Sequence, residues 1–115
     1  MKPTKTSLED FESAARTVKD NDVYKVLDIS RLEHLVVSMT VLHPGKKTSG
    51  HSHAEADEVY MFSAGKGEMR VDEAKMPVRE GDIVLIPRGA FHRVSNTSAA
   101  DLVFVCVFEK YGDRV

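Results

Sequence analysis

The sequence predicts an all-β fold, a sandwich or barrel of short strands with a short helix near its N-terminus. From Val23 onward, segments rich in β-branched and aromatic residues recur about every ten residues. Turn sequences containing glycine and proline separate these segments. Only the residues before Val23 differ, because their apolar side chains fall near helical spacing.

The N-terminal residues predict a short helical extension. Ser7, followed three residues later by Asp10, resembles a weak capping box. Apolar residues from Leu8 to Ala15 then fall near helical spacing, so we expect a helix over residues 7–17. We therefore expect residues 1–22 to form an N-terminal helical extension and residues 23–115 to form one barrel domain.

The expected strands are short segments rich in β-branched or aromatic residues. They are Val23 to Ile29, Leu35 to Leu42, Val59 to Phe62, Glu68 to Val71, Ile83 to Ile86, Phe91 to Ser95 and Leu102 to Phe108. The last of these is apolar on both of its alternating faces, which predicts a strand buried between two layers. The turns between the strands include Pro44-Gly45 and Gly81-Asp82, which supply the fixed and the positive φ that tight turns need.

Composition excludes several classes of partner. The chain has 16 Lys+Arg against 18 Asp+Glu and a formal net charge of −2, so we expect no nucleic-acid partner. Its longest apolar run, Leu102 to Phe108, is seven residues, and its first residues lack the apolar core of a signal peptide. We therefore expect a cytoplasmic protein with no membrane partner. Cys106, the single cysteine, is expected to be a buried, inert thiol.

Three histidines and a carboxylate form a candidate chemical site. Residues two apart on a strand point to the same side, so His51 and His53 can present two imidazoles to one point. His92 supplies a third imidazole. Asp57 and Glu58 both follow the first pair, and spacing alone leaves open which carboxylate reaches the same point.

Two motifs between Gly45 and Asn96 resemble the signature motifs of the cupin superfamily. The first reads Gly45, His51, His53, Glu58, Gly65, and the second reads Gly81, Pro87, Gly89, His92, Asn96, all at the spacing of the family. Glu58 fits the first motif better than Asp57, because Asp57 would place Ala64 rather than a glycine at the closing position.

The resemblance implies a small double-stranded β-helix, or jelly-roll cupin barrel. It implies one divalent metal ion per chain, held by His51, His53, Glu58 and His92. Imidazole and carboxylate ligands suit Mn, Fe, Ni or Zn, so the identity of the metal stays open. Four protein ligands leave positions for water or substrate, which is the condition for catalysis. A homodimer is the family expectation, and Val23 to Ile29 is a candidate edge strand that a second subunit would cover.

The favoured function is a metal-dependent enzyme of small-molecule metabolism acting on a sugar or sugar phosphate, of the isomerase or epimerase type. The stretch from Glu58 to Gly67 resembles the corresponding part of archaeal cupin-type phosphoglucose isomerases. Glu58 and Tyr60 are the candidate catalytic residues, since alternation places both in one cavity. Two alternatives stay open: an iron-dependent dioxygenase with the same ligand set, and a non-catalytic module that binds a small ligand.

Arginines are the candidate binders of an anionic substrate. A guanidinium holds carboxylate or phosphate in bidentate fashion, so Arg70, Arg88 and Arg93 are candidates. Arg88 is expected in a turn, and the direction of Arg70 depends on the register of its strand. Arg93 follows His92 and is expected to point outward. Phe62 is expected in the core.

Overall fold

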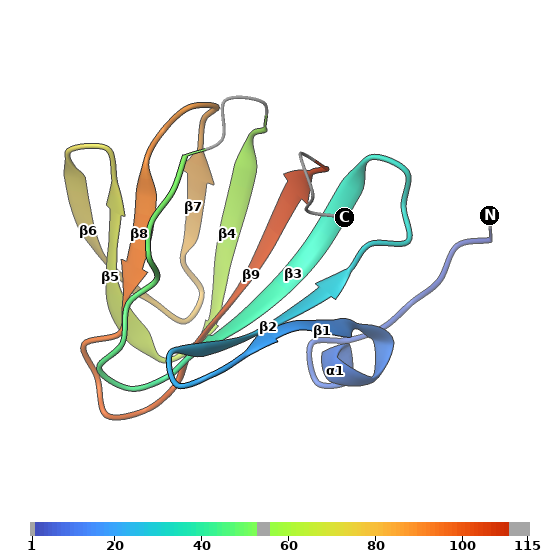
Figure 1. Ribbon diagram of the computed structural model, residues 1–115, viewed down its shortest axis with the longest axis horizontal. Coiled ribbons are helices and arrows are strands. Elements are labelled where there is room, and N and C mark those ends of the chain that lie inside the picture. The colour runs from blue at the N-terminus through green and yellow to red at the C-terminus, as the bar shows by residue number, and fades with distance from the viewer. Residues whose placement is uncertain (1, 53–55, 111–115) are drawn as a thin grey trace.

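The computed structural model (Figure 1) describes residues 2–52 and 56–110. Two antiparallel sheets face each other and form a barrel-like body. In chain order its elements are α1 (Phe11–Ala14), β1 (Arg16–Asp20), β2 (Tyr24–Ile29), β3 (Leu35–Leu42), β4 (Glu58–Ala64), β5 (Lys66–Val71), β6 (Ala74–Arg79), β7 (Ile83–Ile86), β8 (His92–Ser95) and β9 (Leu102–Glu109). The predicted all-β fold with one short helix is confirmed.

The larger sheet has the strand order β1-β2-β3-β9-β4-β7, and the smaller sheet has the order β6-β5-β8. The last strand, β9, therefore lies in the centre of the larger sheet, between β3 and β4. β3 and β7 have the bounds that the sequence predicts, and the other predicted strands agree within two residues at each end.

The predicted helix over residues 7–17 is wrong in extent. α1 spans only Phe11–Ala14, and Ala15 is already extended, with φ −107° and ψ 165°. Arg16–Asp20 form β1, which pairs with β2 at one edge of the larger sheet. A helix this short gains little from its own hydrogen bonds, so pairing with β2 outweighs the helical pattern. The proposed division of the chain at residue 22 stays a prediction, and β1 belongs to the sheet of the barrel.

The sequence does not predict β6. This strand contains Pro77, which lies opposite Glu68 of β5. β6 is an edge strand of the smaller sheet. An edge strand pairs on one side only, so it tolerates a residue without a backbone N–H. Proline disfavours a central strand, and the edge position of β6 tolerates it.

β9 contributes to two apolar clusters, one on each face of the larger sheet. Leu102 and Phe104 belong to the main core between the sheets, together with Phe62, which is buried as expected. Val105 points the other way and packs with Phe11 of α1 in a smaller cluster. The prediction of a strand buried on both faces is thus confirmed, and α1 covers part of the outer face.

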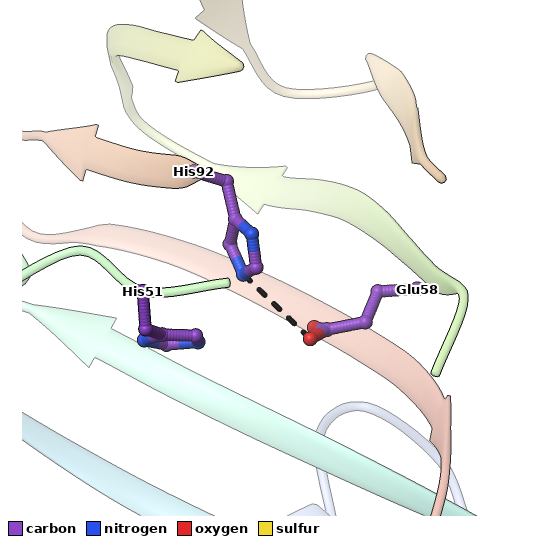
Figure 2. A group of neighbouring side chains, drawn as sticks. All are labelled: His51, Glu58 and His92. Carbon is purple, nitrogen blue, oxygen red and sulfur yellow. Dashed lines mark ion pairs between the residues drawn. The ribbon is translucent and has the colours of Figure 1, made fainter. Parts of the chain in front are cut away.

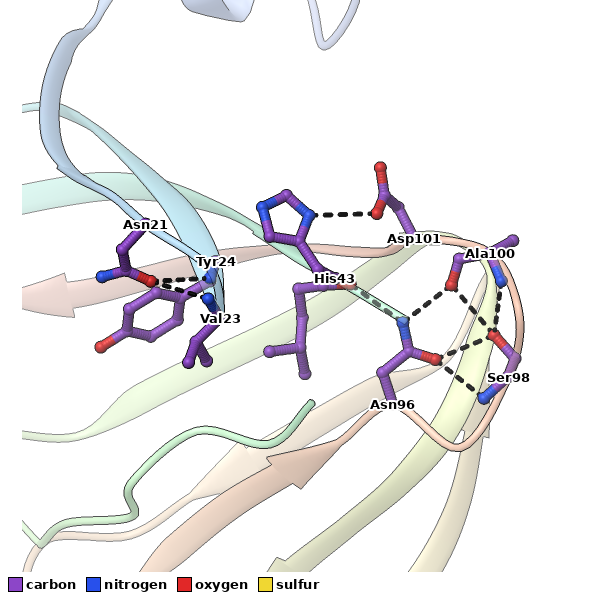
Figure 3. Close-up of polar contacts among 9 residues, drawn as sticks. Asn21, Val23, Tyr24, His43, Asn96, Ser98, Ala100 and Asp101 are labelled. Atoms are coloured by element: carbon purple, nitrogen blue, oxygen red, sulfur yellow. Dashed lines mark hydrogen bonds and ion pairs between the residues drawn. The ribbon is translucent and has the colours of Figure 1, made fainter. Parts of the chain in front are cut away.

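The final residue of the second motif, Asn96, holds the loop between β8 and β9 (Figure 3). Its side-chain amide donates to the carbonyl oxygens of Leu42, at 2.9 Å, and Ala100, at 2.8 Å. Its Oδ1 accepts from the backbone N–H and the hydroxyl of Ser98, at 3.0 and 2.8 Å. Asn96 is therefore a structural residue that fixes the start of β9.

Across the described ranges, no helix is long and apolar enough to cross a membrane.

Candidate metal centre

Backbone pairing brings His51 and His92 together. The N–H of His51 donates to the carbonyl of His92 at 3.1 Å, and the N–H of His92 donates to the carbonyl of His51 at 2.9 Å. The two rings lie edge to face with centroids 4.5 Å apart. Glu58, the first residue of β4, points toward both rings from the larger sheet (Figure 2).

The ligand atoms of His51, Glu58 and His92 all lie within 4.8 Å of one another. Nε2 of His92 is 3.6 Å from Oε1 of Glu58. Glu58 and His92 are buried, at 5% and 2% exposed, whereas His51 is exposed. The group is therefore enclosed by the barrel on one side and open on the side of His51. His53, the fourth ligand that the motif implies, lies outside the described residues and stays a prediction.

The contacts of His92 favour its ligating form. Its Nδ1 lies 3.2 Å from the carbonyl oxygen of Ala90. An Nδ1–H donated to this carbonyl leaves the lone pair of Nε2 directed toward Glu58. Burial lowers the pKa of His92, and the Ala90 carbonyl opposes that shift only in part. Burial therefore favours the neutral imidazole, the form that metal ligation requires.

The three donors fit a divalent transition metal. Metal–ligand bonds of about 2.0–2.2 Å hold two ligand atoms of one ion roughly 3–4.4 Å apart. The observed separations, up to 4.8 Å, need only small side-chain movements to close around an ion. Two imidazole nitrogens and a carboxylate oxygen suit Zn, Fe, Ni and Mn.

A cavity of about 200 Å³ adjoins the cluster and is lined by His51 and Glu58. Its wall also includes Tyr60, whose ring stacks on Phe104 with centroids 5.2 Å apart and an interplanar angle of 16°. Four residues that carry a side-chain hydroxyl also line it: Ser38, Thr40, Thr48 and Ser49. The cavity therefore combines a candidate metal centre with groups that hydrogen-bond a polar ligand.

A family model described as a cupin domain matches residues 38–108. This chain belongs to the cupin family. It is 35% identical over 116 residues to a glucose-6-phosphate isomerase of Thermococcus gammatolerans, a match that covers 87% of this chain and 60% of that protein. It is 30% identical over 94 residues to an uncharacterized protein of Methanocaldococcus jannaschii, covering 82% of this chain and 70% of the relative.

A solved structure from Klebsiella pneumoniae, an uncharacterized conserved protein with a double-stranded β-helix domain, superposes on this cupin with a TM-score of 0.79. The superposition covers 99% of this chain and 95% of that one, at 18% sequence identity. That likeness shows the shared fold and confirms the predicted double-stranded β-helix. This cupin spans about 60% of the length of the isomerase that it matches.

The three candidate arginines have contacts outside the cavity of this cupin. Nε of Arg70 donates to the carbonyl of Asp72, at 2.7 Å, in the turn between β5 and β6. Arg88 pairs with Glu109 at 2.7 Å. Arg93 donates to the carbonyl of Ser49. In the described part of the chain, none of these arginines lines the cavity.

The carboxylate that approaches the histidines of this cupin is Glu58 rather than Asp57. Asp57 accepts a hydrogen bond from the backbone N–H of Arg88 at 3.1 Å and is exposed. His43 also lies apart from the cluster and contacts Asp101 at 3.2 Å. Cys106 is buried as expected and contributes to the wall of the cavity.

Several residues that line the cavity of this cupin are absent from the sequence predictions. Ser38 and Thr40 alternate with apolar residues on β3, and both are buried. Polar residues at positions that alternation assigns to the core are a signal for a polar cavity. Lys19 and Tyr24 also line it, from β1 and β2. The predicted helix over residues 7–17 takes in the first two residues of β1 and ends before Lys19, and no strand was predicted there, so nothing in the pattern indicated Lys19.

Proposed function

We propose that this cupin is a metal-dependent enzyme that isomerises or epimerises a sugar or sugar phosphate. The observation that carries the proposal is the cluster of His51, Glu58 and His92 in the wall of a hydroxyl-lined cavity. The relative from Thermococcus gammatolerans, a glucose-6-phosphate isomerase, supports this substrate class.

We assign the metal to His51, Glu58 and His92, with His53 as the fourth ligand. When bound, a divalent ion there polarises a carbonyl group or adjacent hydroxyl groups of a substrate. The cluster lies at one side of the cavity, so the reacting end of the sugar lies against Glu58 and His51.

Glu58 is the proposed acid–base residue. Conversion of an aldose to a ketose moves one proton between neighbouring carbon atoms, so one group can accept and return it. Among the described residues that line the cavity, Glu58 is the one with a carboxylate. Glu58 would hold the metal through one carboxylate oxygen, and its other oxygen would accept the proton and return it.

Tyr60 is the second proposed catalytic residue. It follows Glu58 by two residues on β4, so both side chains face the cavity. Stacking against Phe104 fixes the plane of its ring. We propose that its hydroxyl contacts a hydroxyl or carbonyl oxygen of the bound sugar and orients the substrate.

The test uses the full chain, loaded separately with Mn²⁺, Fe²⁺, Ni²⁺ or Zn²⁺, under anaerobic conditions. Hexoses, pentoses and their phosphates are followed by NMR in heavy water. The proposal predicts interconversion of an aldose and a ketose, or of two epimers, with deuterium entering at the reacting carbon. Glu58→Gln abolishes turnover, and Asp57→Asn, at the neighbouring exposed carboxylate, retains it.

Two results contradict the proposal. Oxygen consumption with Fe²⁺ and no anaerobic turnover identifies a dioxygenase. Tight ligand binding with no turnover for any of the four metals identifies a non-catalytic binding module.

A further inference from the structure

A β-bulge determines where Lys19 points. Thr17 of β1 lies opposite Leu27 of β2, and Lys19 lies opposite Val26, so Val18 is an extra residue in the pairing. Without the bulge, alternation would leave Lys19 on the same face as Thr17. Leu27 belongs to the outer cluster under α1, whereas Val26 lines the cavity. The bulge therefore turns Lys19 from the outer face to the inner face of the sheet.

Tyr24 holds the side chain of Lys19. Nζ of Lys19 donates to the Tyr24 hydroxyl at 3.2 Å and lies 5.5 Å from the centroid of its ring. The turn before Tyr24 is itself fixed, because Oδ1 of Asn21 accepts from the N–H groups of Val23 and Tyr24, at 2.9 and 3.1 Å (Figure 3). Lys19 and Tyr24 thus form a defined pair in the cavity wall.

Lys19 is the one lysine or arginine among the described residues that line the cavity. The side chain of Lys25, the next lysine along the chain, lies on the opposite face of β2 from Val26. It pairs with Glu12 on the outer side of the sheet. An anionic ligand in this cavity therefore meets one cationic side chain, and that side chain comes from β1.

Lys19 lies at the rim of the cavity, and the opposite wall is buried. Tyr60, Phe104 and Cys106 are at most 6% exposed, whereas Lys19 is exposed. At about 200 Å³, the cavity is smaller than the roughly 300–1,000 Å³ of typical ligand pockets. A sugar with its reacting end at Glu58 therefore has its other end at the rim.

We infer that Lys19 and Tyr24 bind an anionic substituent, a phosphate or a carboxylate, on a sugar whose opposite end lies at the candidate metal centre. This inference rests on the proposed function for the class of ligand. An ammonium group and a phenol donate charge-assisted and neutral hydrogen bonds to such a group. β1 then determines which sugars are bound, and the metal centre determines what happens to them.

The test compares binding of three ligands to the Mn²⁺-loaded full chain by calorimetry: glucose 6-phosphate, glucuronate and glucose. The variants are Lys19→Gln, Lys19→Arg and, as the matched control on the outer face, Lys25→Gln. We expect Lys19→Gln to weaken binding of at least one anionic sugar by about tenfold or more. Binding of glucose and the Mn²⁺ content per chain stay unchanged. Lys19→Arg retains most of the affinity, and Lys25→Gln retains all of it.

The two anionic ligands distinguish phosphate from carboxylate recognition. The inference is wrong if Lys19→Gln binds both anionic sugars as tightly as the wild type, or if the wild type binds neither more tightly than glucose. Turnover is measured separately. Lys19-dependent binding without turnover contradicts the proposed function alone, and turnover that is indifferent to Lys19 and to the charge of the sugar contradicts this inference alone.

Discussion

Asn96 and His92 lie four residues apart in the second motif, and both are 2% exposed, yet they have different roles. The amide of Asn96 donates to two backbone carbonyls and accepts from Ser98, so its hydrogen bonds serve the loop itself. Nδ1 of His92 contacts Ala90, while its Nε2 lies 3.6 Å from Oε1 of Glu58, longer than a hydrogen bond. One motif thus contains a polar residue that holds the barrel together and another that belongs to the candidate metal centre.

The two buried residues should differ in their effect on stability. Asn96 compensates its own desolvation with hydrogen bonds to the chain. His92 and Glu58 place an imidazole and a carboxylate in the interior, and a bound ion would add to the contacts that compensate their desolvation. We therefore expect Asn96 to stabilise the metal-free barrel and His92 to stabilise only the metal-bound one.

The largest expected effect is on metal affinity. His92→Ala removes a ligand, and loss of a residue that merely supports a ligand already costs about 10- to 100-fold. We expect affinity for Mn²⁺ or Zn²⁺ to fall by more than about a hundredfold in a chelator competition titration, with the barrel still folded by circular dichroism. His43→Ala, at a histidine outside the cluster, is the matched control and retains wild-type affinity. A His92→Ala protein that binds metal as the wild type does would show that the cluster is not the site.

The next prediction is that Asn96 affects the stability of the barrel and not its metal content. Asn96→Ala removes the donor to the buried carbonyl of Leu42 and one of two donors to the carbonyl of Ala100, at a cost of about 1–3 kcal/mol in the free energy of unfolding. Urea denaturation of the metal-free protein measures this loss, and metal content per folded chain stays at the wild-type value. If the variant instead loses metal at unchanged stability, the contrast between the two residues fails.

Removal of the metal gives a further test. A ligand at a hundred times its dissociation constant stabilises the native state by about 2.7 kcal/mol. When metal is added back to the chelated wild type, we expect the free energy of unfolding to increase by about this amount. Thermal unfolding detects the increase as a higher midpoint temperature. The same addition stabilises Ser98→Ala, in the Asn96 loop, and leaves His92→Ala unchanged. Equal stabilisation of both variants would place the ion elsewhere.

The smallest effect is the pH dependence of the metal-free barrel. Burial lowers the pKa of His92 in the native state below its ordinary 6.5, so below pH 6.5 the unfolded chain binds a proton that the native chain excludes. Stability is then lost as the pH falls from 6.5 toward the lowered native pKa, by at most about 1.4 kcal/mol per pH unit. Above pH 6.5 this contribution is constant.

Urea denaturation at several pH values between 5 and 8 measures this dependence, in the wild type and in His92→Gln. The difference between the two proteins isolates His92 from the other histidines. Parallel curves for both proteins would contradict a lowered pKa for this residue.

Much of the barrel is predictable because alternation and turn residues repeat over it. β3 and β9 carry apolar residues in long, regular runs, and both were located from the sequence. β1 was missed because Phe11 and its apolar neighbours fit helical spacing, and pairing with β2 is a contact that the local pattern does not contain. β6 was missed because Pro77 argues against a strand unless its edge position is known.

The candidate site, like the barrel, was predictable from the sequence only in part. The motif spacing indicated His51, Glu58 and His92, and the structure brings these residues together. Lys19 was not predictable, because its direction depends on one extra residue in the pairing of β1 with β2. The arginines were the expected anion binders by chemistry alone, but Arg70 and Arg88 contact neighbouring turns and carboxylates instead. Motif spacing thus predicts the cluster of His51, Glu58 and His92, and strand register decides the rest of the cavity.

The most direct test of the central claim is elemental analysis of the full chain, purified without an affinity tag or chelator, as moles of metal per chain. We predict close to one equivalent of a divalent transition metal in the wild type and in Asp57→Asn, and a large loss in Glu58→Ala. A wild-type protein that is metal-free, and stays so after incubation with Mn²⁺, Fe²⁺, Ni²⁺ and Zn²⁺, would contradict the claim that His51, Glu58 and His92 form a metal centre.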